Sequence, residues 1–177
     1  MTDPLVIRQA SAADAPALLA IYAPFVAQTP ITFEVVAPSV DEFAGRIAKC
    51  LSGWQYLVAE RGGRPVGYAY GSMHRERHAY RFSTEVSAYV EPSCHRQGVG
   101  RALYTQLFED LATKGYCNAY AGVTVPNDAS IGLHSAVGFE MIGVFKNIGW
   151  KFGRWHDVAW MQRTLRDAPP EDRQDDV

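Results

Sequence analysis

The alternation of apolar and polar positions along the chain predicts a sheet of short strands interrupted by helices. Runs rich in Val, Ile, Leu, Tyr and Phe, bounded by glycine, proline or polar clusters, are typical of strands. Such runs cover residues 5–8, 56–60, 65–70, 85–90, 119–125, 140–148 and 158–165. The pair Gly62-Gly63 predicts a hairpin turn between the second and third runs. Because hairpins alternate with strand–helix units, the order predicts an α/β fold with a mixed sheet and helices on both faces.

Helices are predicted between these strands by apolar periodicity and by capping signals. They are expected over residues 12–27, 39–53, 102–114 and 127–137. Leu103, Leu107 and Leu111 recur at four-residue spacing, so one side of the third helix is expected to pack inward. Residues 149–157 are expected to connect the last two strands.

Composition indicates one folded domain that is not built for nucleic acid or membrane. The 177 residues suggest a single domain over residues 1–166, followed by an acidic, proline-containing tail over 167–177 that we expect to be disordered. A net charge of -2 argues against a dedicated nucleic-acid-binding protein. No apolar run is long enough to span a bilayer, and the N-terminus lacks the features of a signal peptide. We therefore expect a cytoplasmic protein.

Cysteine usage argues against a disulfide framework and against a structural zinc site. The chain has three cysteines, Cys50, Cys94 and Cys117, which are widely spaced and form no CxxC pair. A reducing cytoplasm fits this pattern, and no metal is expected.

A glycine turn between the fourth strand and the third helix carries the clearest chemical signal. The first N–H groups of a helix have no internal partner, and the helix dipole places partial positive charge there. Glycines let a phosphate approach the backbone closely, and arginines add charge. The predicted phosphate or pyrophosphate site comprises Arg96, Gln97, Gly98, Val99, Gly100 and Arg101.

Other glycine motifs fit this turn less well. A P-loop ends in Gly-Lys-Ser/Thr, whereas Gly100 is followed by Arg101-Ala102. A dinucleotide-binding fingerprint has glycine or alanine where Leu103 stands. Taken alone, the glycine pair is equally compatible with a plain tight turn.

With this element order, the residues resemble the GNAT superfamily of acetyl-CoA-dependent N-acetyltransferases over residues 5–165. The family's turn begins with Gln or Arg, and this chain has His95 there. A second landmark is an Asn followed by a helix that ends in Gly-Phe, here residues 127–139. His134 stands where many members carry a tyrosine that acts as general acid to the leaving thiolate.

The chain is most similar to one branch of that superfamily, the phosphinothricin and methionine sulfoximine acetyltransferases. The most specific shared block is Lys-Phe-Gly-Arg-Trp-His-Asp at residues 151–157. The resemblance implies a mostly antiparallel twisted sheet, acetyl-CoA as co-substrate, and a homodimer. It also implies that the coenzyme contacts strand and helix residues besides the turn. These are Ala88, Tyr89, Val90, Asn127 and Ser130. Asn127 is equally reasonable as a helix N-cap.

Acetyl transfer to an amine needs a group that removes the amine's proton. Glu85 lies on the strand before the turn and is predicted to be the general base, directly or through a water. Composition alone would favour a solvent-facing glutamate. His134 is the second candidate, and protonation of the thiolate, help in deprotonating the amine, and a structural role all stay open.

An arginine cluster before Glu85 indicates the chemistry of the acceptor. Arginine binds carboxylates through two parallel hydrogen bonds, so Arg75 is predicted to hold an amino-acid carboxylate, with a solvated basic loop as the alternative. The predicted acceptor-binding residues are Phe33, Glu34, Arg75, Arg77, Tyr80, Glu85 and Ser87.

The sequence as a whole predicts direct transfer of an acetyl group from acetyl-CoA, in a ternary complex, to the α-amine of a small acceptor. Phosphinothricin, methionine sulfoximine and methionine sulfone are the expected acceptor types. The biological role stays open between detoxification of a foreign compound and acetylation of an ordinary metabolite, because both would use the same residues. The alternatives are an enzyme that acetylates polyamines or protein N-termini, and a protein that binds acyl-CoA as a sensor without catalysis. A polyamine site would have acidic residues in place of the arginines at 75–81, and retention of Glu85 and His134 argues against a sensor.

Overall fold

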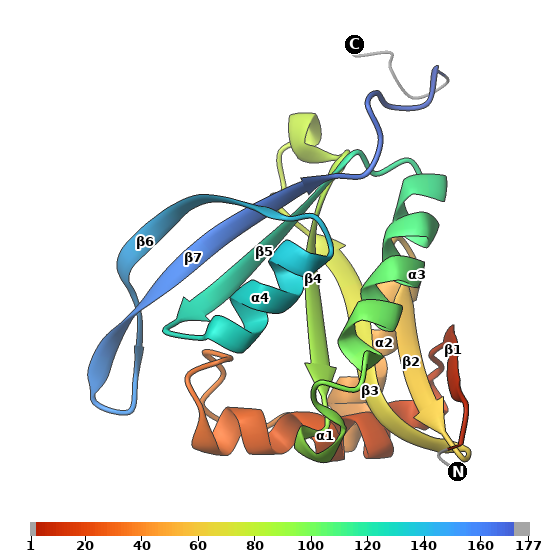
Figure 1. Cartoon of the computed structure of the whole chain (residues 1–177), viewed down its shortest axis with the longest axis vertical. Helices are drawn as coiled ribbons and strands as arrows, with labels where there is room; N and C mark the ends of the chain where they lie inside the picture. The colour runs from red at the N-terminus through yellow and green to blue at the C-terminus, as the bar shows by residue number, and fades with distance from the viewer. Residues whose placement is uncertain (1–2, 172–177) are drawn as a thin grey trace.

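The computed structural model describes residues 3–171 and contains one sheet of seven strands in the order β1-β2-β3-β4-β5-β7-β6 (Figure 1). The strands are β1 (Leu5–Gln9), β2 (Tyr56–Arg61), β3 (Arg64–Met73), β4 (Ser83–Val90), β5 (Asn118–Val125), β6 (Glu140–Lys151) and β7 (Arg154–Thr164). Only β4 and β5 are parallel neighbours, and every other pair is antiparallel. The predicted mixed, mostly antiparallel sheet is confirmed.

Helices cover both faces of the sheet, as predicted (Figure 1). The helices are α1 (Ala15–Gln28), α2 (Val40–Leu51), α3 (Val99–Thr113) and α4 (Asp128–Ala136), with short 3-10 turns η1 (Ala12–Asp14), η2 (His78–Tyr80) and η3 (Pro92–Cys94). Helices α1 and α2 pack on one face against Tyr56, Val58 and Tyr68. The predicted leucine stripe of α3 is fully buried on the other face, where α4 also packs. Two apolar layers therefore hold the central strands between them.

Three predicted boundaries are wrong, and each error has a local cause. Residues 149–157 are not a connection, because β6 and β7 pair through Trp150 and Trp155 to a tight turn at Phe152-Gly153. Both turn residues have positive φ, which glycine tolerates. The first helix begins after the 3-10 turn η1, and α3 begins at Val99 because the turn glycine Gly98 is already its N-cap.

Strands β4 and β5 pair over three residues only and then separate. Ser83–Glu85 lie opposite residues 118–120, after which β4 pairs only with β3 and β5 only with β7. Figure 1 shows the two strands diverging below this point. The facing backbone edges of residues 86–90 and 121–125 are thus left without a strand partner, next to Glu85.

The predicted division into a domain over 1–166 and a tail over 167–177 stays a prediction. Residues 1–2 and 172–177, which include most of that tail, lie outside the described residues. Among residues 3–171, no helix is long and apolar enough to cross a membrane.

Candidate active site

The glycine turn has the backbone geometry expected of an anion site. Gly98 is the N-cap of α3 and has φ +80°, a left-handed conformation that side chains disfavour. The N–H of Ala102 donates to the Gly98 carbonyl at 2.9 Å, so the earlier N–H groups of α3 have no acceptor within the helix. No atom lies within 4 Å of the place where a Gly98 Cβ would be. The turn therefore presents unpaired N–H groups to open space.

Side chains around the turn hold its shape. The Gln97 amide donates to the Ser93 carbonyl at 2.8 Å and accepts a hydrogen bond from Arg61. The His95 ring lies 2.9 Å from the Val90 carbonyl. Gln97 was predicted to contact the coenzyme, and the structure shows that its amide is already used within the loop. Arg96, which was predicted for the same role, is exposed and has positive φ.

Gly100 has a packing role that the sequence did not reveal. A Cβ at this position would lie 2.8 Å from Cδ2 of Leu133 on α4, closer than real Cβ contacts. Glycine here lets α3 and α4 approach each other, while the neighbouring Val99 is buried in the core. The second glycine of the motif therefore also sets the distance between the two helices.

Helix α4 brings its three predicted residues together, but buries one of them. The Asn127 side chain caps the helix by accepting from the Ser130 N–H at 3.1 Å. His134 is only 5 % exposed, and its Nδ1 lies 2.7 Å from the Ser130 carbonyl. Its Nε2 lies 3.0 Å from the hydroxyl of Tyr104 on α3. Burial lowers the pKa of His134, so this pair of helices is joined by a neutral histidine.

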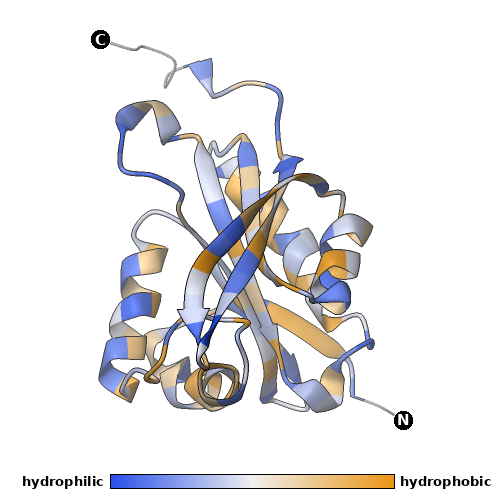
Figure 2. Ribbon diagram, turned by 90° about the vertical axis from the view of Figure 1, so that its left-hand side faces the viewer, coloured by the Kyte–Doolittle hydropathy of each residue, from blue (hydrophilic) through white to orange (hydrophobic). Residues whose placement is uncertain are grey.

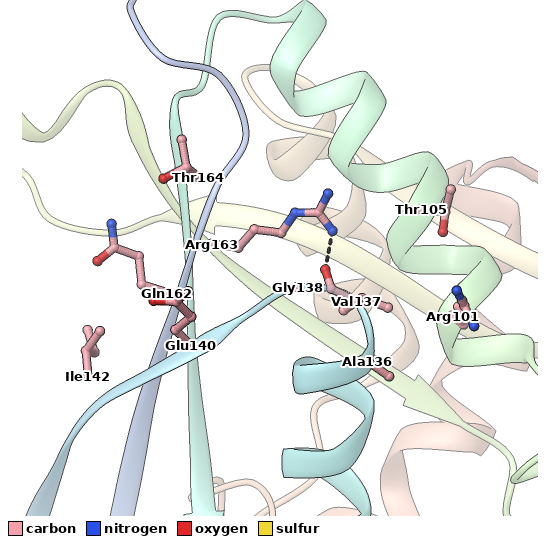
Figure 3. A pocket seen from close by; sticks show the side chains of 10 residues that line it. All are labelled: Arg101, Thr105, Ala136, Val137, Gly138, Glu140, Ile142, Gln162, Arg163 and Thr164. Atoms are coloured by element: carbon pink, nitrogen blue, oxygen red, sulfur yellow. Dashed lines mark hydrogen bonds between the residues drawn. The ribbon is translucent and has the colours of Figure 1, made fainter.

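A cavity of about 580 Å³ opens between α3, the end of α4 and the last strands (Figure 3). Arg101 and Thr105 line it from α3, and Arg163 lines it from β7, where its guanidinium donates to the Val137 carbonyl. The cavity adjoins the glycine turn through Arg101. Of the predicted coenzyme residues, Arg101 is the one that lines this space.

Glu85 lies on the opposite face, where β4 and β5 separate. Side chains alternate along β4, so Glu85, Ser87 and Tyr89 share one face, and Tyr89 packs on Tyr22 of α1. The Glu85 side chain is 35 % exposed, and its Oε1 lies 3.0 Å from Nδ1 of His74. Burial raises the pKa of Glu85, while the hydrogen bond from His74 and the charge of Arg75 oppose that rise.

The predicted arginine loop also lies beside Glu85. Arg75 is exposed, with its guanidinium carbon 5.7 Å from the centre of the Tyr80 ring. Arg77 is exposed and precedes the turn η2, where the Tyr80 N–H donates to its carbonyl at 2.9 Å. Arg75, Tyr80 and Glu85 are therefore neighbours, whereas the Arg77 side chain has no hydrogen-bond or ion-pair partner among residues 3–171.

The loop that carries Phe33 and Glu34 is fixed by residues that sequence reasoning missed. Glu34 accepts from the Tyr22 hydroxyl at 2.9 Å and pairs with Arg46 of α2 at 2.7 Å. Lys151 of β6 is 4 % exposed. Its ammonium donates to the backbone carbonyls of residues 26, 29 and 32 at 2.7, 2.8 and 2.8 Å.

The Phe33 ring completes this docking. It lies so close to Gly149 that no Cβ would fit there, and its centre is 6.2 Å from that of the His156 ring. The loop is therefore docked on the β6–β7 hairpin. In the sequence, Lys151 and His156 were marked only as members of the shared block at residues 151–157, and Gly149 was not marked.

The two groups of predicted residues meet at the point where β4 and β5 diverge. The coenzyme residues of the turn, α3 and α4 lie on the α3 side of the sheet, whereas Tyr89 shares the α1 side with Glu85 and its neighbours. In the described part of the chain no hydrogen bond joins Glu85 to His134, and the histidine that contacts Glu85 is His74. His74 and Tyr104 are the site residues that the sequence did not single out.

Comparison with known proteins is consistent with this geometry. Residues 7–160 match the family model described as Acetyltransferase (GNAT) domain. A phosphinothricin N-acetyltransferase from Alcaligenes faecalis is 46% identical over 154 residues, covering 86% of this chain and 78% of the relative. An L-methionine sulfoximine/L-methionine sulfone acetyltransferase from Salmonella typhimurium is 34% identical, covering 91% of this chain and 95% of that protein.

A solved structure gives the same likeness in three dimensions. The crystal structure of a GNAT superfamily phosphinothricin acetyltransferase from Sinorhizobium meliloti, in complex with acetyl-CoA, superposes with a TM-score of 0.89 at 38% identity and covers 94% of both chains.

Proposed function

This chain belongs to the GNAT acetyltransferase family, an acyltransferase family that uses acetyl-CoA, and from that premise we propose that it N-acetylates the α-amine of a small amino-acid-like acceptor. Phosphinothricin, methionine sulfoximine and methionine sulfone are the proposed acceptor types. The observation that carries the proposal is the half-buried Glu85 carboxylate at the divergence of β4 and β5, with Arg75 beside it. A base for the amine and a cation for the carboxylate then stand side by side.

The residues present fit acetyl-CoA, which supplies an acetyl group activated as a thioester. The unpaired N–H groups after Gly98 suit its pyrophosphate, with Arg96 and Arg101 adding positive charge nearby. The backbone edge of Ala88–Val90 that β5 leaves unpaired, where the Val90 carbonyl already meets the His95 ring, suits the amides of the pantetheine arm. Asn127 and Ser130, at the start of α4, are proposed to border the same arm.

Glu85 is proposed to accept the proton of the acceptor ammonium, which leaves a neutral amine as nucleophile. A carboxyl with a pKa raised by burial is a stronger base than an exposed one. Direct transfer is supported by the setting of the cysteines near the site. Burial raises the pKa of the Cys50 thiol to about 12, and the His95 ring bonds to a backbone carbonyl rather than to Cys94.

The setting of His134 supports the structural role among the three that the sequence left open. Both ring nitrogens have neutral partners, the Ser130 carbonyl and the Tyr104 hydroxyl, and the ring is buried. Such a ring would hold α4 against α3 and orient the Tyr104 hydroxyl. We propose the buried Tyr104 hydroxyl of α3 as the group that His134 positions.

The acceptor carboxylate is proposed to bind Arg75, with Tyr80 bracing its guanidinium. Phe33 and Glu34 are proposed to border the acceptor from the docked loop, and Ser87 from β4. Arg77 is proposed to add long-range attraction for an anionic acceptor.

The decisive experiment measures thiol release from acetyl-CoA with one amine at a time. The panel contains phosphinothricin, methionine sulfoximine, methionine sulfone, ordinary amino acids, spermidine and a short peptide. Turnover confined to the amino-acid-like acceptors is the expected result. Turnover on spermidine or the peptide alone would contradict the acceptor assignment, and coenzyme binding without any turnover would favour a sensor.

The ternary mechanism has its own test in initial rates with both substrates varied. Intersecting double-reciprocal lines are expected when both substrates must be bound together. Parallel lines would indicate a covalent acetyl-enzyme and would overturn direct transfer.

A homodimer is also proposed, and the β6–β7 hairpin is the surface that supports it. β6 is an edge strand, and large apolar side chains along the hairpin are exposed. They are Met141, Ile142, Val144, Phe145, Ile148, Trp150, Phe152 and Trp155. Figure 2, in which this hairpin crosses the front, shows hydrophobic segments along it. Light scattering on the purified protein is expected to give twice the mass of one chain, and the mass of one chain would contradict this surface's role.

A further inference from the structure

His74 follows the last residue of β3 and lies inside a group of aromatic rings. Its side chain is 13 % exposed. The imidazole stacks on Tyr120 of β5, with ring centres 4.6 Å apart and planes 16° from parallel. Tyr80 and Trp160 approach it edge-on, at 5.8 and 6.3 Å. Three rings from three different segments therefore fix the plane of the imidazole.

The ring so fixed directs one nitrogen at a carboxylate. Nδ1 of His74 lies 3.0 Å from Oε1 of Glu85. An ionised carboxylate only accepts hydrogen bonds, so Nδ1 must carry the proton and donate it. The antiparallel register explains the encounter, because Glu85 lies opposite Ser72, and His74, two residues after Ser72, falls on the same face as a diagonal neighbour of Glu85.

We propose that His74 is a positioning residue for Glu85, holding one carboxylate oxygen by a hydrogen bond from Nδ1 and leaving the other oxygen free to take the proton of the acceptor amine. The inference rests on the proposed function, in which Glu85 is the base. It adds a residue that this function does not require.

The charge balance around Glu85 gives this contact a measurable consequence. The groups that face the carboxylate are His74 and Arg75 after β3, with Tyr120 from β5 and Tyr80 from η2 lying around the imidazole. Burial raises the pKa of Glu85, and the His74 hydrogen bond and Arg75 lower it. Without the hydrogen bond from His74, only the charge of Arg75 offsets the rise that burial causes, so the pKa of Glu85 becomes higher. The base is then protonated at a pH where the wild type is active.

Two substitutions separate the hydrogen bond from the ring packing. His74→Phe keeps an aromatic ring for Tyr120 to stack on but has no donor. His74→Asn loses the ring, but its amide nitrogen is as far along the side chain as Nδ1 and is able to donate to Glu85. If His74 is purely structural, His74→Phe should lose less activity than His74→Asn. If His74 positions Glu85, His74→Asn should lose less activity than His74→Phe.

The experiment records kcat/KM against pH for the wild type, His74→Phe, His74→Asn and Glu85→Gln with the best acceptor. For His74→Phe the acid limb is expected to move to higher pH, with a loss of about tenfold near pH 6.5 that shrinks toward the alkaline plateau. For His74→Asn the acid limb of the pH profile is expected to stay close to that of the wild type. An unmoved limb in His74→Phe, or an equal loss at every pH in both variants, overturns the inference.

Two further readouts keep the result unambiguous. Unaltered turnover in Glu85→Gln would refute the proposed base itself, which is distinct from failure of the His74 inference alone. Histidine ¹⁵N NMR on the wild-type protein needs no variant to fold. A protonated Nδ1 on His74 at neutral pH is expected, and a proton on Nε2 alone would show that His74 is not the donor.

Discussion

On the α3 side of the sheet the proposed coenzyme site is formed by backbone, whereas on the α1 side the proposed acceptor site is formed by side chains. The turn at Gly98 offers N–H groups, and the Gln97 amide is used up within the loop. Around Glu85 the contacts are an imidazole, a guanidinium and tyrosine rings. A cofactor common to a whole family can be bound by backbone, because its shape does not change.

His134 and His74 show the same contrast. His134 bonds to a carbonyl and a hydroxyl, so its environment favours the neutral ring. His74 bonds to a carboxylate, so it acts on a charge. One ring joins two helices, and the other is proposed to set the behaviour of a base. The partner, rather than the residue type, decides which role a histidine takes.

The largest expected effect comes from removing the base on the acceptor side. Glu85→Gln should lower kcat by about 10²- to 10⁴-fold, because the amide cannot take the amine's proton. The KM for acetyl-CoA should change little, since the proposed coenzyme contacts are the glycine turn, the start of α4 and backbone groups of β4, none of which is the Glu85 side chain. Steady-state kinetics with each substrate varied tests both statements. A large rise in the KM for acetyl-CoA would mean that the two sides are not separable.

Lys151→Met tests whether the acceptor loop depends on its buried cation. Three backbone carbonyls would lose their donor, at a cost of about 3 kcal/mol in the free energy of unfolding. The KM for the acceptor should rise because the loop carrying Phe33 loosens. Lys146→Met is the matched control on the same strand, since Lys146 is exposed and pairs only with Asp157. Equal effects of the two changes on urea unfolding would contradict the role of Lys151.

On the coenzyme side, Gly100→Val should force α3 and α4 apart. The added carbons would meet Leu133, at a cost of about 1–3 kcal/mol, and the KM for acetyl-CoA should rise. Gly132→Val is the matched control, because nothing lies within 4 Å of a Cβ at that position on α4. Thermal unfolding and acetyl-CoA titration measure the stability and the coenzyme affinity of both variants. Wild-type stability and affinity in Gly100→Val would contradict the packing role of Gly100.

Arg75→Ala should raise the KM for amino-acid acceptors by about tenfold, the usual value of a charge-assisted hydrogen bond to a carboxylate. The KM for an acceptor with an amide in place of the carboxylate should stay the same. Arg77→Ala, at the exposed arginine with no partner seen here, is expected to have a smaller effect that salt abolishes. An equal loss on both acceptors would show that Arg75 acts on the loop rather than on the substrate.

The smallest effect concerns pH and the histidine between the helices. Burial holds the pKa of His134 below its ordinary value, so the unfolded chain binds a proton at a higher pH than the folded chain does. The stability due to His134 is complete above about pH 6.5 and declines as the pH falls through the folded pKa, by at most about 1.4 kcal/mol per pH unit. Urea unfolding from pH 8 to pH 5 should show this decline, and His134→Gln should reduce its slope.

The sequence by itself determined the fold class, most of the elements and the glycine turn, because these depend on residues close together in the chain. Apolar periodicity marks a strand or helix within a few residues, and a left-handed N-cap such as Gly98 is visible as a glycine before a helix. The hairpin end at Phe152-Gly153 was missed, since residues 149–157 contain two glycines and several charged residues, which are typical of a loop, and they become strands by pairing with each other.

Only the tertiary structure decided how the site is supported, because each supporting contact joins residues far apart in the chain. His74 meets Glu85 across the β3–β4 register, Tyr104 meets His134 between two helices, and Lys151 reaches back to the end of α1. A histidine in a polar loop, a tyrosine on a buried helix face and a lysine in a strand carry no local signal for these roles. Their chemistry follows from strand register and helix packing, which a single sequence does not specify.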